Sequence, residues 1–225
     1  MRRFGATVRR GPPVVAARGA AHGALTGKKL IGKLAALTIA ALTWGLVNFG
    51  LLLWLPADLV AKGYSVAVSS KLLAESALIA FPTVFLCALM YSRWSTKWSL
   101  VTMIGVTLLG LVGVLRLELA GIGSPVLPVA LLIVGSSGII AILLPYTAES
   151  FPLRVRGRAT GWVAACTKGG GVAAQALSIT ALVPAMGVTA GLIIVPTVLA
   201  LGLCAWFGRE TKGRDLRLLD DALVG

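Results

Sequence analysis

Two ionisable residues, Glu75 and Lys168, stand inside long apolar runs of this 225-residue chain. An ionised side chain near the middle of a bilayer costs about 3 kcal/mol on insertion scales, so both are expected to face protein or a water-filled cavity. Glu75 could carry a proton or a cation, and Lys71 lies one helical turn away as a neutralising partner. The alternative is a pair of charges that reaches the outer membrane surface.

Lys168 is followed by three glycines, Gly169 to Gly171. Glycines in a span allow a close approach of helices or a local unwinding, and discontinuous helices often form transporter sites. Lys168 could therefore hold an anionic substrate, and the alternative is an amine that reaches the cytoplasmic surface. Weaker candidates for lining a cavity are Trp44, Asn48, Tyr146 and Gln175, each of which could equally serve packing or interhelical hydrogen bonding.

A third group of charges follows one apolar run, where Glu149 is succeeded by Pro152 and then by Arg154, Arg156 and Arg158. Proline stops a helix, and three arginines want water, lipid phosphates or an acidic partner. One interpretation is an ordinary basic loop between two spans. The other is an ion-pair latch in which Glu149 pairs with one of these arginines or with one from a neighbouring loop.

The chain offers little for metal, redox or hydrolytic chemistry. The three cysteines lie in apolar runs without paired spacing, and the single histidine is His22. We therefore expect no metal site and no cofactor. The run GSSG (residues 135–138) fits the Gly-x-Ser-Gly of rhomboid-like proteases, but no histidine in a span could serve as its base, so we predict that the chain is not an enzyme.

Two motifs resemble those of a known family. The run PYTAESFPLRVRG (residues 145–157) resembles the loop after the tenth span of major facilitator superfamily transporters, in the sugar porters and their organic-acid and niacin-type relatives. The run RETKGR (residues 209–214) resembles the Pro-Glu-Thr-Lys-Gly-Arg signature after their last span. The resemblance implies a cytoplasmic gate that includes Glu149, Arg154, Arg156 and Glu210.

A third family motif is only partly present. The loop after the eighth span usually reads Asp-Arg-x-Gly-Arg-Arg, and here SRWSTK (residues 92–97) keeps Arg93 without the acid and the glycine. Arg93 could still pair with Glu149 or Glu210. The sugar porters' pattern in the seventh span is absent, which favours a small organic acid over a sugar.

Composition defines the class of protein. The chain is 57% hydrophobic and 13% charged, with a mean hydropathy of +0.92, whereas soluble domains carry about a quarter charged residues. We predict an all-α membrane protein with six transmembrane helices that form one half-bundle of the major facilitator fold. The predicted spans are approximately residues 34–55, 66–90, 100–117, 126–151, 161–182 and 187–207.

The positions of the basic residues predict the orientation. Most lysines and arginines border the ends of apolar runs on the side that also holds both termini, which is the positive-inside pattern and not a nucleic-acid-binding face. We expect a basic cytoplasmic leader (1–33), a six-helix transmembrane domain (34–208) and a cytoplasmic tail (209–225), in the plasma (inner) membrane. The expected partners are the lipid bilayer, a small-molecule substrate and protons.

The family has twelve spans, so the resemblance implies that this chain corresponds to spans seven to twelve. Substrate in such transporters lies between two halves. The chain could therefore pair with an N-terminal half or with a second copy. We predict proton-coupled symport of a small organic acid or sugar-like metabolite by a half-length chain, and the alternative is a truncated bundle without transport of its own that acts as an assembly module.

Overall fold

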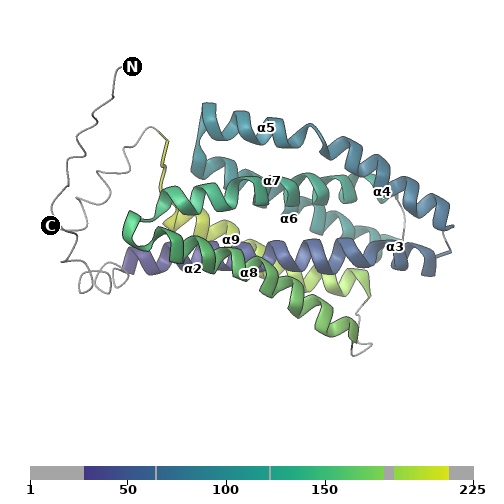
Figure 1. Ribbon diagram of the computed structural model, residues 1–225. Coiled ribbons are helices and arrows are strands. Elements are labelled where there is room, and N and C mark those ends of the chain that lie inside the picture. Colours follow the sequence, from purple (N-terminus) through teal and green to yellow (C-terminus); the bar gives the residue numbers. More distant parts are fainter. Residues whose placement is uncertain (1–27, 64, 122, 180–184, 213–225) are drawn as a thin grey trace, which may run out of the picture.

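The computed structural model describes residues 28–63, 65–121, 123–179 and 185–212, and the regular elements in these ranges are helical (Figure 1). The first rod is continuous through α2 (Lys28–Leu46), the π-helical turn η1 (Val47–Leu51) and α3 (Leu52–Ala61). The second contains α4 (Val66–Ala80), α5 (Thr83–Leu89) and the π-helical turn η2 (Met90–Trp94). The remaining rods are α6 (Thr96–Ala120), α7 (Val126–Ser150), α8 (Leu153–Ile179) and α9 (Met186–Phe207).

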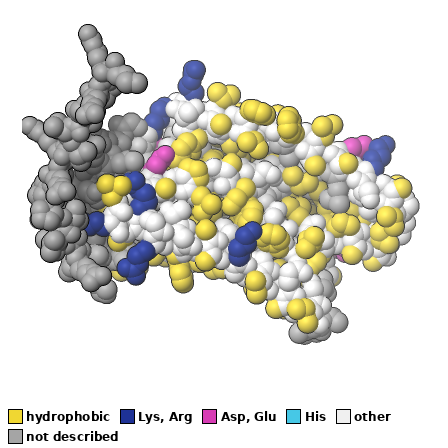
Figure 2. All heavy atoms as spheres, viewed as in Figure 1, with side chains coloured by type: hydrophobic (Ala, Val, Ile, Leu, Met, Phe, Trp, Pro, Cys, Tyr) yellow, Lys and Arg dark blue, Asp and Glu magenta, His cyan; other side chains and the backbone are white. Residues whose placement is uncertain are grey.

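The rods run up and down, so their ends gather at two places (Figure 1). At one end α2, α6 and α8 begin and α7 and α9 finish; we call it the motif end, because residues 149–157 and 209–212 lie there. At the opposite end α3 and α6 finish and α4 and α9 begin. Figure 2 shows basic side chains gathered toward the motif end and apolar side chains along the rods.

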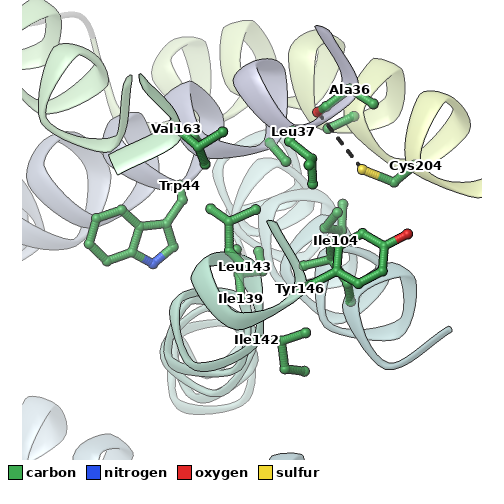
Figure 3. Packing of buried hydrophobic residues seen from close by; sticks show 14 of the residues in the cluster. Ala36, Leu37, Trp44, Ile104, Ile139, Ile142, Leu143, Tyr146, Val163 and Cys204 are labelled. Atoms are coloured by element: carbon green, nitrogen blue, oxygen red, sulfur yellow. Dashed lines mark hydrogen bonds between the residues drawn. The ribbon is translucent and has the colours of Figure 1, made fainter. Parts of the chain in front are cut away.

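Two buried apolar clusters hold the bundle together. The larger one lies toward the motif end and joins α2, α6, α7, α8 and α9 around Leu37, Leu143 and Val163 (Figure 3). The smaller one lies toward the opposite end and includes Leu55 and Leu59 of α3. The second rod packs chiefly against α7 and exposes large apolar side chains on its outer side, as a lipid-facing helix does.

Small residues bring α2 and α8 together. A Cβ on Gly170 would collide with the backbone oxygen of Leu42 and lie 3.1 Å from the Cα of Gly45. Gly170 therefore serves close helix packing, one of the two roles expected of the glycines after Lys168. The other role, a local unwinding, is not seen, because α8 is a continuous helix through these residues.

Within the described ranges, five helical rods are long and apolar enough to cross a membrane: Leu30–Ala61, Val66–Trp94, Thr96–Ala120, Val126–Ser150 and Met186–Phe207. They confirm an all-helical membrane protein at this level. The predicted fifth span falls on α8, which is not among the five. Three arginines in its first turns, together with Lys168, Gln175 and a run of glycines, make α8 the least apolar of the long helices.

Two predicted boundaries were wrong. The first rod continues beyond Pro56 to Ala61, since neighbouring backbone and local adjustments let a spanning helix tolerate proline. α8 begins at Leu153, so the arginines predicted to lie in a loop occupy its first turns. Proline is well suited to the start of a helix, and the carbonyl of Pro152 accepts the first helical hydrogen bonds, from the amides of Val155 and Arg156.

Candidate functional site

Trp44 and Asn48 connect the first rod to α7. The indole Nε1 of Trp44 donates to the carbonyl oxygen of Ser136 at 2.8 Å, and the Ser136 hydroxyl donates to the Asn48 side-chain oxygen at 3.4 Å. Trp44 is buried in the core and Asn48 is half-buried. Ser136, which occupies the variable position of the protease-like motif, therefore takes part in helix–helix hydrogen bonding.

The π-helical turn η1 carries Phe49, which sequence reasoning missed. The Gln175 side-chain amide donates to the backbone carbonyl of Phe49, which fixes α8 against this turn. π-turns are rare and are often found at functional sites. The Phe49 ring makes an edge-to-face contact with Trp44, with centroids 5.8 Å apart. In the sequence, the only sign of a role for Phe49 is its position next to Asn48.

Lys168 completes this group. Its Nζ lies 5.0 Å from the centroid of the Phe49 ring, in cation–π contact. Lys168, Phe49 and Gln175 line an open hollow of about 430 Å³ with apolar walls from α8. We call Trp44, Asn48, Phe49, Lys168 and Gln175 the central cluster. The structure thus brings together four of the predicted binding residues.

The depth of Lys168 bears on its two alternative roles. Because α8 runs from Leu153 to Ile179, Lys168 lies two residues from the middle of the helix, about 3 Å along its axis. A lysine at the end of a span can extend to the membrane surface. A lysine at mid-helix with an exposed side chain is compatible with either role, so the role of Lys168 in a site stays a prediction.

Glu75 lies apart from the central cluster. It pairs with Lys71 in its own helix, with 3.8 Å between Lys71 Nζ and Glu75 Oε1, so the predicted i, i+4 pair is confirmed. Both side chains are exposed, at 76% for Lys71 and 51% for Glu75. Whether the carboxylate carries a proton stays a prediction.

Tyr146 is not part of the central cluster. It is buried near the motif end (Figure 3), and its hydroxyl donates to the carbonyl oxygen of Arg209 at 2.8 Å. Its position therefore differs from the cavity-lining one considered from the sequence. It fixes the segment that follows α9 onto the end of α7.

Glu149 is bound by a hydroxyl. The Thr211 hydroxyl lies 2.7 Å from the Glu149 carboxylate and also 2.7 Å from the Thr96 hydroxyl. The backbone amide of Thr211 donates to Thr96 Oγ1 at 3.1 Å. The segment after α9 is thereby attached to the end of α7 and to the start of α6.

Glu210 caps the N-terminus of α6. Its carboxylate accepts from the Thr96 amide at 2.9 Å and the Thr96 hydroxyl at 2.7 Å, and also from the Ser95 hydroxyl. An anion at a helix N-terminus is stabilised by the free amides and the helix dipole. Burial opposes the charged form, but these hydrogen bonds outweigh it and lower the pKa of Glu210 to about 2.

The arginines do not form the expected latch in the part of the chain that the structure describes. The ion pairs found there join Lys62 to Asp58 and Glu118, and Lys71 to Glu75. Arg154 and Arg93 are exposed, and Arg156 Nε donates to the carbonyl oxygen of Phe151 at 3.4 Å. Hydroxyl groups, not guanidinium groups, bind both gate carboxylates.

Lys33 was assigned to the leader, but it belongs to α2 and is buried. Its Nζ donates to the carbonyl oxygen of Ser150 at 3.1 Å and lies 5.9 Å from the Phe151 ring centroid. A cation is favourable at a helix C-terminus, where carbonyl groups lack partners. The sequence signal was a lysine in the first turns of an apolar run.

The chain resembles two named bacterial transporters, and no protein-family model matches it. The chain is 26% identical over 177 residues to the niacin transporter NiaP of Acinetobacter baylyi, and 27% identical over 172 residues to the putative niacin/nicotinamide transporter NiaP of Bacillus subtilis. Each match covers 75% of this chain, and 38% and 42% of the relatives. The chain thus spans about two fifths of the length of these relatives.

The helices and the relatives agree on a coarse description. Long apolar helices require a lipid environment, and both relatives are named as transporters, which argues against an enzyme. In the central cluster, Lys168 of α8 places a cation beside the aromatic ring of Phe49 in η1. This chain is an integral membrane protein similar to membrane transporters.

Proposed function

We propose that this chain is the C-terminal half, spans seven to twelve, of a major facilitator-type secondary transporter, and that the central cluster binds a small organic acid. The observation that carries the proposal is the ammonium group of Lys168 beside the Phe49 ring, at mid-helix on α8 and open to one side of the bundle. A cation so placed needs an anion or a polar partner.

The substrate that fits best is an aromatic monocarboxylate. The relatives are named for niacin, which is a pyridine carboxylic acid. Its carboxylate would pair with Lys168 and its ring would lie against Phe49, with Gln175 as a neighbouring hydrogen-bonding group. The apolar walls of the hollow suit an aromatic ring better than a sugar, which needs many hydrogen-bonding partners.

Proton coupling and gating are the finer parts of the proposal. Glu75 is the candidate proton carrier, and its exposed position on α4 leaves it free to face a partner half. The contacts of Glu149 and Glu210 with Thr96 and Thr211 would keep α6, α7 and the segment after α9 together at the cytoplasmic side. Arg93, Arg154 and Arg156 would join this gate in another state of the transport cycle.

Uptake into proteoliposomes tests the proposal. Vesicles would contain this chain alone, or this chain with an N-terminal six-span half supplied as a separate polypeptide, and labelled nicotinate would be offered with and without an inward proton gradient. We expect uptake that the gradient stimulates and that Lys168→Ala abolishes. Arg116→Gln, which removes an exposed cation from α6, is the matched control and should transport like the parent. Equal uptake by Lys168→Ala and the parent would exclude this site.

A second candidate is an assembly module without transport of its own. Two observations favour it: the hollow is open, and the chain covers only 38% of the length of the Acinetobacter baylyi relative. Substrate in these folds lies between two halves, so one half would offer an incomplete site. No uptake with or without the N-terminal half would support this candidate, whereas uptake by the chain alone would exclude it.

A further inference from the structure

An ion pair joins two rods at the end of the bundle opposite the motifs. Lys62, directly after α3, contacts Glu118 in the last turn of α6 through its Nζ, and it also pairs with Asp58 of its own rod at 2.7 Å. In the described residues, the Lys62–Glu118 contact is the ion pair that connects different rods. Burial alone would lower the pKa of Lys62, but hydrogen bonds to both carboxylates raise it.

The space beneath this ion pair is incompletely filled. A hollow of about 320 Å³ lies between α3, α6, the start of α7 and the start of α9, and Lys62 and Glu118 are among its lining residues. Leu55 and Leu59 of α3 form part of its apolar wall. Because protein interiors are normally close-packed, α3 is held here by fewer dispersion contacts than a fully packed helix.

α3 also has a point about which it can turn. The π-helical turn η1 separates it from α2, and such turns mark bends in helices. Gln175 donates a hydrogen bond to the carbonyl of Phe49 and so fixes this turn to α8. Among the hydrogen bonds found in the described residues, the one made by Lys62 is the one that connects α3 to α6 or α9. The first rod is therefore fixed at η1 by a hydrogen bond to α8, whereas beyond η1 the helix α3 is held by the apolar contacts of Leu55 and Leu59 and by the ion pair of Lys62.

A glycine helps to position the Glu118 carboxylate. A Cβ on Gly187, in the first turn of α9, would lie 2.8 Å from the Cβ of Glu118. The absence of a side chain at Gly187 lets Glu118 lie against α9 and reach Lys62. Three elements thus meet at one charged contact.

We propose that Lys62 and Glu118 form a clamp that holds α3 against α6 over the hollow, and that breaking this pair lets α3 swing outward about η1. The clamp acts on the conformation of the first rod. The charged pair itself lies outside the central cluster, although the turn η1 carries Asn48 and Phe49. The clamp does not require a bound substrate, so it stands whether or not the chain transports an organic acid. Opening would expose the apolar wall of the hollow, and Leu59 in particular, which is 4% exposed in the closed arrangement.

Thiol labelling of Leu59→Cys in nanodiscs tests the clamp. A membrane-impermeant maleimide should react slowly in the otherwise unaltered chain, since the three natural cysteines are buried and the introduced one lies in the hollow. Adding Glu118→Gln or Lys62→Met should raise the labelling rate about five-fold, which corresponds to about 1 kcal/mol for a partly exposed ion pair. The exchange of charges, Lys62→Glu with Glu118→Lys, should return the rate close to that of the starting protein.

Two further variants complete the test. Asp58→Asn removes the partner within the first rod and leaves the contact with Glu118, so it should change the rate little. Leu119→Cys, exposed at 79%, should label equally fast in every background and reports that the chain is folded. The proposal would be overturned if Glu118→Gln left the labelling rate of Leu59→Cys unchanged. It would also be overturned if the charge-exchanged protein were labelled as fast as the Glu118→Gln variant.

Discussion

At the scale of residues, the charged side chains of the central cluster and of the motif end have different kinds of neighbours. In the central cluster the Lys168 ammonium has an aromatic ring as its neighbour and an open hollow before it. At the motif end the carboxylates of Glu149 and Glu210 are enclosed by hydroxyl and amide donors. The first arrangement leaves a charge available for a ligand, and the second uses charge to hold segments together.

Glu210 gives a pH-dependent prediction. A carboxyl group whose pKa is lowered on folding, here to about 2 from 4.5, contributes stability that is complete above about pH 4.5 and is lost as the pH falls toward 2. Glu210→Gln should therefore lower the thermal midpoint of the detergent-solubilised chain at neutral pH, by the equivalent of about 1 kcal/mol, as loss of a helix cap does.

Thermal unfolding of both proteins from pH 7 to pH 3 measures this effect. The difference between parent and variant should be constant down to about pH 5 and then shrink. A difference that grows as the pH falls would contradict the capping role of Glu210.

The residues of the site could be predicted from the sequence only one at a time. Lys168, Gln175, Asn48 and Trp44 stood out because polar or bulky groups are unusual in apolar runs. Phe49 did not, since an aromatic residue in a span is ordinary, and its contact with Lys168 depends on how α2 and α8 cross. The hydroxyl partners of Glu149 were equally invisible, because a charge-based search favours arginine over threonine.

At the scale of elements, the positions of the helical rods could be predicted from hydropathy, but the π-helical turns and the exact ends of the rods could not. Apolar runs predicted six spans, and among the described residues five helical rods are long and apolar enough to cross a membrane. The π-turns, the continuation of the first rod through Pro56 and the early start of α8 depend on backbone hydrogen bonding that hydropathy does not report. Gly170 of α8 proved to be a contact point with α2.

The crossing of α2 and α8 gives a prediction with a built-in control. Gly170→Ala places a methyl group against the backbone of Leu42 and Gly45 and should destabilise the bundle by about 1–3 kcal/mol, as overpacking does. Gly169→Ala meets only the Leu42 side chain at 3.7 Å, an ordinary contact, and should be neutral or stabilising because alanine favours helix. Thermal midpoints of the two variants would separate them; equal effects would mean that the close approach is unimportant.

At the scale of the whole molecule, the proposed function expects the open hollow beside Lys168 to face a partner half, whereas the apolar side chains of α5 and α9 suit lipid. Membrane crossing by α8 as well as by the five apolar rods would place both termini on one side. This topology was predicted from the positions of the basic residues.

Protease protection tests this topology. Epitope tags at the two termini of the chain, expressed in inner membranes, should both be cleaved in inverted vesicles and both be protected in spheroplasts. Cleavage of one tag in each preparation would show that the number of crossings is odd and that α8 does not span the bilayer.

The central claim is that Lys168 and Phe49 form the anion-binding part of a transport site. Its most direct test is equilibrium binding of labelled nicotinate to the full chain in nanodiscs, with an N-terminal half present and absent. We predict that Lys168→Met weakens binding at least ten-fold, the equivalent of about 1.4 kcal/mol, that Lys168→Arg retains most of it, and that Arg116→Gln binds like the parent. The same affinity in Lys168→Met as in the parent protein would contradict the account.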